Sequence, residues 1–276
     1  MTAHSVKNSV IDNYGKLAKS VKYKVFSKLF SCCDTSTTDL IGQKIGYSQE
    51  DLNSVPEDAN LGIGCGNPAA LANIGVADTV VDLGSGAGFD AFLVAAKVGD
   101  EGKVLGIDLS DEMLSLARKN AKKGNYNNVE FIKGDIEDLP LEDGIADYII
   151  SNCVINLSLN KKAVFKEAYR VLKNGSRLAI SDIVLEKELP DFIKNSLAGH
   201  LACVSGAERI ETYLGYIKDA GFQDIKIEQK SDFPLELMLA DPVIAKLAKV
   251  MNFNLDSEEA KDIASRVKSI AISARK

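Results

Sequence analysis

A glycine-rich loop directly after an apolar run is the feature that most constrains the fold of this chain. The run from Thr79 to Leu83 is followed by Gly84-Ser85-Gly86-Ala87-Gly88 and then by a helical pattern from Phe89 to Val98. Glycines after a first strand allow a tight turn, and they let a ligand approach bare backbone beside a helix N-terminus. The segment therefore predicts the first strand–loop–helix unit of a nucleotide-binding α/β domain.

The same alternation continues to Ile183. Apolar runs predict further strands over 104–108, 129–132, 146–151 and 177–183, and amphipathic patterns predict helices over 111–123 and 161–172. Ser110 or Asp111 would cap the first of these helices, and Asn174-Gly175 would end the second. Alternating strands and helices of this kind predict βαβ units on a mostly parallel sheet.

The flanking segments have a different character. A lysine-bearing amphipathic stretch runs from Val6 to Phe30, helical patterns cover 191–201 and 207–220, and strand-like patterns cover 225–228 and 267–274. We expect three parts: an N-terminal helical segment or lid (1–60) that carries Cys32 and Cys33, a cofactor-binding domain (61–189), and an acceptor-binding region (190–276) that completes the sheet.

Charge and cysteine content narrow the function. The net charge of −6 argues against a nucleic-acid partner, which needs a clustered basic surface. No apolar run approaches the roughly 20 residues of a membrane span, and Met1 to Ser9 lacks the apolar stretch of a signal peptide, so we expect a cytoplasmic protein. The odd number of cysteines, five, indicates reduced thiols. The chain has two histidines and no Cys-x-x-Cys, which disfavours a structural zinc site.

The spacing of the glycines distinguishes between cofactors. The dinucleotide pattern G-x-G-x-x-G would need glycine at position 89, which is Phe89. The observed pattern, D-x-G-x-G-x-G from Asp82 to Gly88, resembles the first motif of Rossmann-like (class I) S-adenosylmethionine-dependent methyltransferases. Asp108, about 20 residues beyond the last glycine, and Gly134-Asp135-Ile136 extend this resemblance.

The resemblance implies a mostly parallel seven-stranded sheet flanked by helices, with S-adenosylmethionine as the cofactor. Asp82 would hold the methionine amino group, Asp108 the ribose hydroxyls and Asp135 the adenine amino group, with Ile136 against the ring. The other residues expected at the cofactor are Gly84, Ser85, Gly86, Gly88, Leu109, Met113 and Asn152. Taken singly, each acid could be a helix cap and each glycine a turn, but together, after successive strands, they favour a cofactor site.

Three cysteines occupy positions that suit an acceptor site. Cys153 follows the fourth predicted strand, and ligands of such sheets lie beyond the carboxyl ends of the strands. Cys65 lies in a loop rich in glycine, and Cys203 follows the fifth strand. A free cysteine often fills a hydrophobic core, and these three are far apart in sequence, so only the fold could bring them together.

The strings around these cysteines resemble those of arsenite methyltransferases. They are Tyr47–Leu52, Leu61–Pro68, Val81–Asp90, Ser151–Ser158 and Cys203–Ala207. The resemblance implies that Cys65, Cys153 and Cys203 bind As(III), and that Cys32 or Cys33 is a redox partner. It further implies arsenic detoxification by a protein that we expect to be monomeric, with thioredoxin or glutathione as the thiol reductant.

The chemistry agrees with this resemblance. Trivalent arsenic is soft, and thiolates are the ligands that select soft centres. The activated methyl of a sulfonium needs positioning more than acid–base assistance, which suits a chain poor in histidine. Two alternatives remain open: a methyltransferase for a small organic acceptor such as a quinone precursor or a sterol, and a non-catalytic metalloid-binding protein. The first leaves the three cysteines without a role, and the second has no need of a cofactor site.

Overall fold

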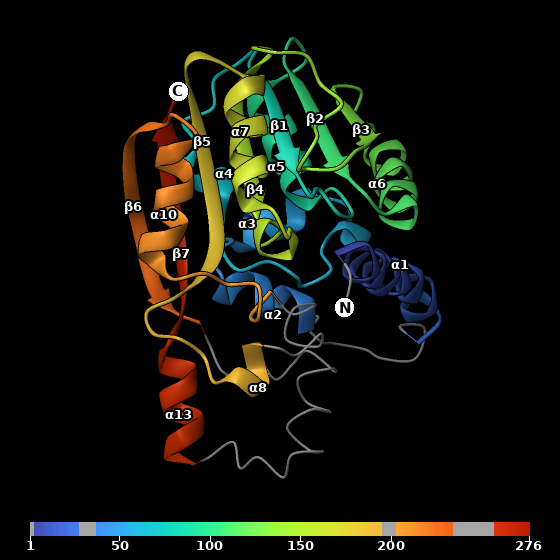
Figure 1. Cartoon of the computed structure of the whole chain (residues 1–276). Helices are drawn as coiled ribbons and strands as arrows, with labels where there is room; N and C mark the ends of the chain where they lie inside the picture. The colour runs from blue at the N-terminus through green and yellow to red at the C-terminus, as the bar shows by residue number, and fades with distance from the viewer. Residues whose placement is uncertain (1–2, 28–36, 195–202, 234–256) are drawn as a thin grey trace.

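The computed structural model describes residues 3–27, 37–194, 203–233 and 257–276. Its centre is a seven-stranded sheet with the order β3-β2-β1-β4-β5-β7-β6 (Figure 1). The strands are β1 (Thr79–Leu83), β2 (Lys103–Asp108), β3 (Val129–Lys133), β4 (Ala146–Asn152), β5 (Leu172–Leu185), β6 (Gln223–Asp232) and β7 (Val267–Arg275).

All neighbouring pairs from β3 to β5 are parallel, whereas β7 runs antiparallel to both β5 and β6. The predicted α/β fold, with a mostly parallel seven-stranded sheet, is therefore confirmed. The C-terminal part of the chain supplies β6 and β7 to the same sheet, and the division at residues 60 and 189 stays a prediction.

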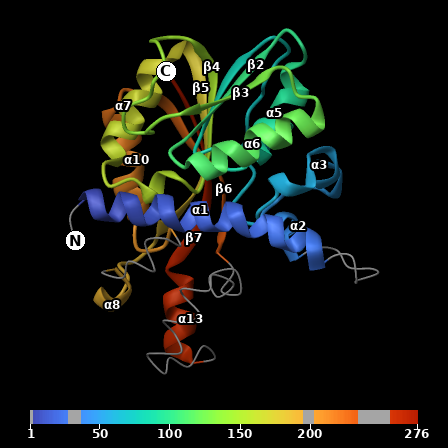
Figure 2. The same cartoon turned by 90° about the vertical axis from the view of Figure 1, so that its right-hand side faces the viewer.

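Helices cover both faces of the sheet (Figure 2). One layer holds α4 (Pro68–Leu71), α5 (Phe89–Val98) and α6 (Asp111–Gly124), and the other holds α7 (Lys161–Val171) and α10 (Ile210–Asp219). Side chains of β1 alternate between the two layers, so that Val80 packs with the first and Val81 with the second. Because both faces are covered, the central strand β1 is buried from Val80 to Leu83.

The remaining elements lie around the ends of the sheet. They are α1 (Ala3–Ser27), α2 (Thr37–Lys44), α3 (Gln49–Ser54), η2 (Glu57–Ala59), η3 (Ile155–Leu157), α8 (Asp191–Lys194) and α13 (Glu258–Ser265). Helix α1 crosses the lower end of the sheet in Figure 2, where Ala18 packs against Met113 and Leu116 of α6. Among the described residues, no helix has the length and apolarity to span a membrane.

The element boundaries differ from expectation at several places, and two of them are instructive. Helix α7 ends at Val171 and β5 begins at once, so Asn174-Gly175 lies inside the strand. Leu172 already pairs with Ala146, and the pairing with β4 is irregular before Arg177, which explains the turn residues there. Of the helix expected over 191–201, α8 covers the first part and residues 195–201 lie outside the described residues.

Candidate active site

The two segments that carry the predicted chemistry meet because β1 and β4 are neighbours in the sheet. The strand order reverses between them, since β2 and β3 lie on one side of β1 and β5 on the far side of β4. Ligands of doubly wound sheets bind in the crevice at this reversal, beyond the carboxyl ends of the strands. The glycine loop follows β1 and Cys153 follows β4, so both face this crevice.

Backbone hydrogen bonds hold the glycine loop against β2. The amides of Gly84 and Ser85 both donate to the Ile107 carbonyl, at 2.8 and 3.0 Å. The Gly86 amide donates to Asp108 Oδ2 at 2.9 Å. Gly86 has a φ of +53°, and a Cβ there would meet no atom within 4 Å, so the loop leaves open space beside its backbone.

Asp82 is a buried carboxyl with an unused oxygen. It is 2% exposed, and no hydrogen-bond donor among the described residues reaches its Oδ2. Burial raises the pKa of Asp82 well above its usual range, and the nearby Asp90 and Asp108 carboxyls raise it further. An orphaned buried carboxyl of this kind favours a cationic group, such as the methionine amino group of S-adenosylmethionine.

Asp108 holds the other side of the same loop. Its oxygens accept hydrogen bonds from the amides of Gly86, at 2.9 Å, and Ser110, at 2.8 Å. Burial raises the pKa of the Asp108 carboxyl. Because each carboxylate oxygen has two acceptor positions, Asp108 keeps acceptor capacity for hydroxyl groups of a ligand.

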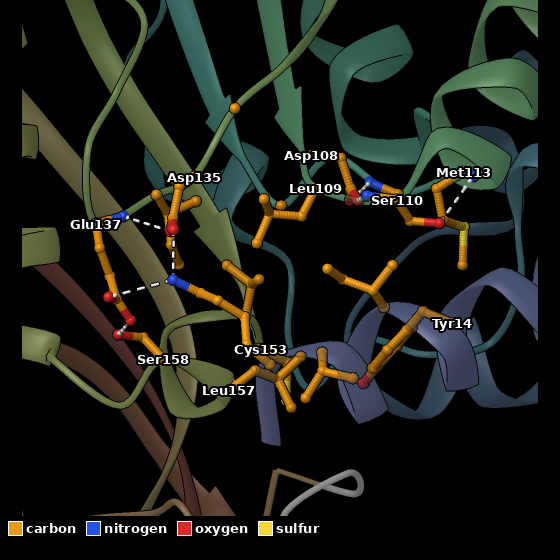
Figure 3. Close-up of a pocket in the computed structure, with 18 of the residues that line it drawn as sticks. Tyr14, Asp108, Leu109, Ser110, Met113, Asp135, Glu137, Cys153, Leu157 and Ser158 are labelled. Atoms are coloured by element: carbon orange, nitrogen blue, oxygen red, sulfur yellow. Dashed lines mark hydrogen bonds and ion pairs between the residues drawn. The ribbon is translucent and has the colours of Figure 1, made fainter. Parts of the chain in front are cut away.

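A pocket of about 820 Å³ opens beside these residues (Figure 3). Of the residues predicted at the cofactor, its lining includes Gly84, Gly86, Asp108, Leu109, Met113, Asp135, Ile136 and Asn152. A second hollow of about 580 Å³ includes Asp82, Gly84, Ser85, Gly86 and Asn152 in its lining. Gly88 lines neither hollow and instead forms the N-cap of α5, with a φ of +94°. The set of residues around the two hollows thus fits an S-adenosyl cofactor.

Asp135 already has a cationic partner in the structure. Lys7 of α1 forms an ion pair with Asp135 and a second one, at 3.3 Å, with Glu137 (Figure 3). Glu137 in turn accepts a hydrogen bond from Ser158 Oγ at 2.8 Å. Lys7 thus occupies the carboxylate that the resemblance assigns to the adenine amino group.

The three predicted acceptor cysteines lie together. Cys65 Sγ and Cys153 Sγ lie within 4.8 Å of each other, and all three cysteines pack in one buried cluster. The Cys203 thiol also donates to the Cys153 carbonyl at 2.9 Å, and the Cys65 thiol donates to the Ser181 carbonyl at 3.4 Å. Cys153 lines the larger pocket, whereas Cys65 and Cys203 are 3% and 4% exposed. Cys32 and Cys33 lie outside the described residues.

Two of these cysteines have an unusual backbone. Cys153 and Cys203 adopt φ values of +59° and +62°, in the left-handed region that non-glycine residues rarely enter. Strained residues of this kind are concentrated at functional sites, because the surrounding structure must compensate their cost. The backbone strain therefore favours a functional role for Cys153 and Cys203 over simple filling of the core.

The local environment keeps the thiols protonated. Burial raises the pKa of the Cys65 thiol to about 11. For Cys203, hydrogen bonding to Cys153 and then burial raise the thiol pKa well above its usual value. For Cys153, a hydrogen bond with Cys203 lowers the thiol pKa, but the interaction with Cys65 and burial together outweigh it.

Sequence reasoning missed a buried carboxyl beside the thiols. Cys65 Sγ, Cys153 Sγ and a carboxylate oxygen of Asp182 lie within 4.8 Å of one another. Asp182 accepts hydrogen bonds from Tyr213 Oη at 2.8 Å and Asn156 Nδ2 at 2.9 Å, and burial raises its pKa to about 6. Asp182 lies inside β5, whereas the sequence analysis looked for site residues just after the strands.

Helix α1 also contributes residues that the sequence did not reveal. Lys7 and Tyr14 line the larger pocket, and the Tyr14 hydroxyl lies 4.0 Å from Cys203 Sγ. From the sequence, this stretch was only a lysine-bearing amphipathic segment. The amphipathic pattern predicted the helix, but its partners are distant in sequence.

Comparison with known proteins agrees with this geometry. Residues 74–234 match the family model described as "Methyltransferase domain". An arsenite methyltransferase from Halobacterium salinarum is 43% identical over 201 residues, which are 73% of this chain and 51% of that protein. The structure also resembles the crystal structure of an arsenic(III) S-adenosylmethionine methyltransferase from Chlamydomonas reinhardtii. That likeness has a TM-score of 0.61 and 27% identity, and it covers 88% of this chain and 74% of the other.

The similarity to a quinone methyltransferase covers a smaller part of the chain. The 2-phytyl-1,4-beta-naphthoquinone methyltransferase of Arabidopsis thaliana is 42% identical over 108 residues, which are 38% of this chain and 41% of that protein. The chain spans about half the length of the Halobacterium relative. Because the family model matches more than half of its residues, the chain belongs to the methyltransferase-domain family.

Proposed function

We propose that this protein is an S-adenosylmethionine-dependent methyltransferase that methylates trivalent arsenic, for arsenic detoxification. The observation that carries the proposal is the packing of Cys65, Cys153 and Cys203 in one cluster, of which Cys153 lines the cofactor pocket. Three thiols from separate segments match the preference of As(III) for sulfur. The similarity to arsenite methyltransferases supports the same substrate.

The cofactor would be held at its two ends by carboxyl groups. Asp82 would bind the methionine amino group. Its Oδ2 is buried without a hydrogen-bond partner among the described residues, and the Asp90 and Asp108 carboxyls nearby make the surroundings favourable for a cation. Asp108 would accept from the ribose hydroxyls and the Gly86 backbone would allow close approach. When bound, S-adenosylmethionine supplies an electrophilic methyl group.

The thiols would load arsenic by exchange. Arsenous acid carries three hydroxyl groups, and three cysteine thiols replace them, so that three water molecules leave with the thiol protons. The product is a pyramidal arsenic bound to three sulfurs with one lone pair. Because Cys153 lines the pocket while Cys65 and Cys203 lie behind it, the chain holds the metalloid at the cofactor wall.

Turnover also requires electrons. Methylation formally oxidises arsenic from the trivalent to the pentavalent state, so a dithiol must return two electrons and become a disulfide. Cys32 or Cys33 would be the enzyme's own redox partner, and thioredoxin or glutathione the external reductant. We propose a monomer in the cytoplasm, where thiols stay reduced.

Methylation of an organic acceptor is the main alternative. The similarity to the quinone methyltransferase covers the common core, and it offers no role for the three thiols. A metalloid-binding protein without catalysis would leave the buried Asp82 carboxyl without a role.

The test is a methyl-transfer assay with methyl-labelled S-adenosylmethionine and a thiol reductant, offering arsenite or a demethylated quinone. We expect labelled methylarsenic and no labelled quinone, and we expect Cys153→Ser to lose arsenic methylation while it still binds S-adenosylhomocysteine. Undiminished methylation by Cys153→Ser would contradict the proposed site. Arsenite binding without methylation would favour the non-catalytic alternative, and labelled quinone the organic acceptor.

A further inference from the structure

The carboxamide of Asn152, at the carboxyl end of β4, contacts both halves of the site. Its Oδ1 accepts a hydrogen bond from the Cys65 amide at 3.0 Å. Its Nδ2 lies 3.0 Å from Asp90 Oδ2, 2.9 Å from Tyr47 Oη and 2.8 Å from the Gly66 carbonyl. Asn152 also lines both hollows of the pocket.

The chemistry of these partners determines the orientation of the amide. A backbone N–H can only donate, so Cys65 must face the oxygen of Asn152. A carbonyl can only accept, so Gly66 must face the nitrogen. If the amide were flipped, its nitrogen would face the Cys65 N–H and its oxygen would face the Gly66 carbonyl, so neither hydrogen bond could form. Asparagine is the side chain of this length that combines an acceptor with two donor hydrogens, which accounts for its presence here.

On the cofactor side, Asn152 belongs to a buried cluster. Asp90, in the first turn of α5, is 8% exposed and accepts a hydrogen bond from Tyr47 Oη at 2.6 Å. Tyr47 is 5% exposed. Both residues line the smaller hollow together with Asp82 and the glycine loop. A ligand that fills this hollow therefore lies against the same groups that hold the Asn152 nitrogen.

On the acceptor side, Cys65 has two backbone anchors from different strands. Asn152 of β4 binds its amide, and Ser269 of β7 donates to its carbonyl at 2.6 Å. The Cys65 side chain is buried, and its Sγ lies within 4.8 Å of Cys153 Sγ. A shift of the Asn152 amide would therefore move the Cys65 sulfur relative to Cys153. In the described part of the chain, Ser269 makes no hydrogen bond to Asp90 or Tyr47.

We propose that Asn152 is a positioning residue that couples occupation of the cofactor pocket to the placement of the Cys65 thiol. This inference rests on the proposed function. A bound S-adenosyl ligand holds the Tyr47–Asp90–Asn152 cluster, and the held amide fixes Cys65 for the third bond to arsenic. Linkage is reciprocal, so bound arsenic raises the affinity for the S-adenosyl ligand by the same factor.

The test measures arsenite binding by equilibrium dialysis, with and without saturating S-adenosylhomocysteine, in wild type and in Asn152→Leu. The wild type should bind arsenite at least about fivefold more tightly when S-adenosylhomocysteine is present. Asn152→Leu should weaken arsenite binding by about tenfold or more. It should also bring the ratio of affinities with and without S-adenosylhomocysteine close to one.

Two controls separate coupling from simple anchoring and from general destabilisation. Ser269→Ala removes the other anchor of Cys65, so it should weaken arsenite binding but keep the wild-type ratio. Asn128→Ala removes amide bonds to the carbonyls of Ala95 and Gly99, away from the pocket, and should change neither quantity. If Asn152→Leu does not fold by circular dichroism, Asn152→Ala serves in its place.

An unchanged ratio in a folded Asn152 variant, or loss of the ratio in Ser269→Ala as well, would overturn the coupling. Wild-type protein that binds both ligands with no mutual effect would do the same while leaving the proposed function standing. Wild-type protein that fails to bind arsenite would overturn both.

Discussion

At the scale of single residues, the buried Asp82 carboxyl lowers the stability of the folded chain and at the same time provides a binding group for the cofactor. Its carboxyl is buried with an unpaired oxygen, and burial next to Asp90 and Asp108 raises its pKa well above the usual range. A carboxyl whose pKa is higher in the folded than in the unfolded chain must take up a proton on folding or suffer the cost of a buried charge. It therefore destabilises the fold as the pH rises above the unfolded value of about 4.

Asp82→Asn should consequently raise the free energy of unfolding at neutral pH by about 1 kcal/mol or more. The gain should grow with pH from about 4 upward. The same substitution should weaken S-adenosylhomocysteine binding at least about tenfold, because the amide has no charge to offer the amino group. Denaturant titration at several pH values and calorimetric binding measure the two effects, and a variant less stable than wild type would contradict the assignment.

Gly86, in the glycine loop, can be compared with Gly144, which lies outside the site and has a similar backbone conformation. Gly86 and Gly144 have φ values of +53° and +64°, and a Cβ at either would meet no atom within 4 Å. Alanine at either position should cost about 1–2 kcal/mol of stability from backbone strain alone. Only Gly86→Ala places a methyl group in the hollows, so it alone should weaken S-adenosylhomocysteine binding, by about tenfold or more.

Equal losses of affinity in the two alanine variants would mean that the loop does not approach the ligand. Calorimetric titration of both variants, at a temperature where both are folded, makes the comparison.

At the scale of elements, helix α1 closes the cofactor pocket and competes for one of its acids. Lys7 pairs with Asp135 and Glu137, while Lys19 of the same helix pairs with Glu112 of α6 at 2.9 Å. The adenine amino group and the Lys7 ammonium would need the same Asp135 carboxylate. Because Lys7 lines the pocket beside Asp135, we expect an adenine bound at Asp135 to displace the lysine.

Lys7→Gln should strengthen S-adenosylhomocysteine binding by about two- to fivefold, the value of a partly exposed ion pair. Lys19→Gln, which loosens the same helix without freeing Asp135, should not strengthen it. The gain from Lys7→Gln should disappear when Asp135 is replaced by asparagine. Weaker binding by Lys7→Gln would mean that the lysine supports the ligand instead of competing with it.

Elements with strong local patterns were predictable from the sequence. Strand β1, the glycine loop and α5 were correct to the residue, because apolar runs and glycines act locally. The start of β5 was not, since Leu172 is a strand residue only through its pairing with Ala146 of β4. The position of α1 over the pocket depends on contacts with residues more than a hundred positions away, such as Lys7 with Asp135, and no local pattern encodes these.

At the scale of the whole molecule, the proposed acceptor site depends on the fold as a whole. Sequence motifs could nominate Cys65, Cys153 and Cys203, but the order of the strands is what brings them together. Asp182 escaped prediction because its neighbours come from other segments, among them Tyr213. The cofactor half was more predictable, since its residues follow successive strands of one alternating pattern.

The protonated resting state of the thiols predicts an unusual pH dependence. The Cys65 thiol has a pKa of about 11, and arsenous acid brings a hydroxyl for each thiol proton, so loading releases water and no protons. Arsenite affinity should therefore change by less than about threefold between about pH 7 and 8.5, a window above the pKa of about 6 of Asp182. Cadmium, which brings no hydroxyl, should instead bind more tightly by up to about tenfold per pH unit for each thiol.

Equilibrium dialysis across this range makes the comparison. Arsenite affinity as steep in pH as that of cadmium would contradict the protonated resting site.

The most direct test of the account is X-ray absorption at the arsenic edge, on protein loaded with less than one equivalent of arsenite and no added thiol. We expect three sulfur neighbours on arsenic in the wild type and in the Cys32→Ser, Cys33→Ser double variant. We expect two sulfur neighbours in each of Cys65→Ser, Cys153→Ser and Cys203→Ser. Oxygen in place of one sulfur in the wild type, or three sulfurs retained in any of these single variants, would contradict a site built from these three thiols.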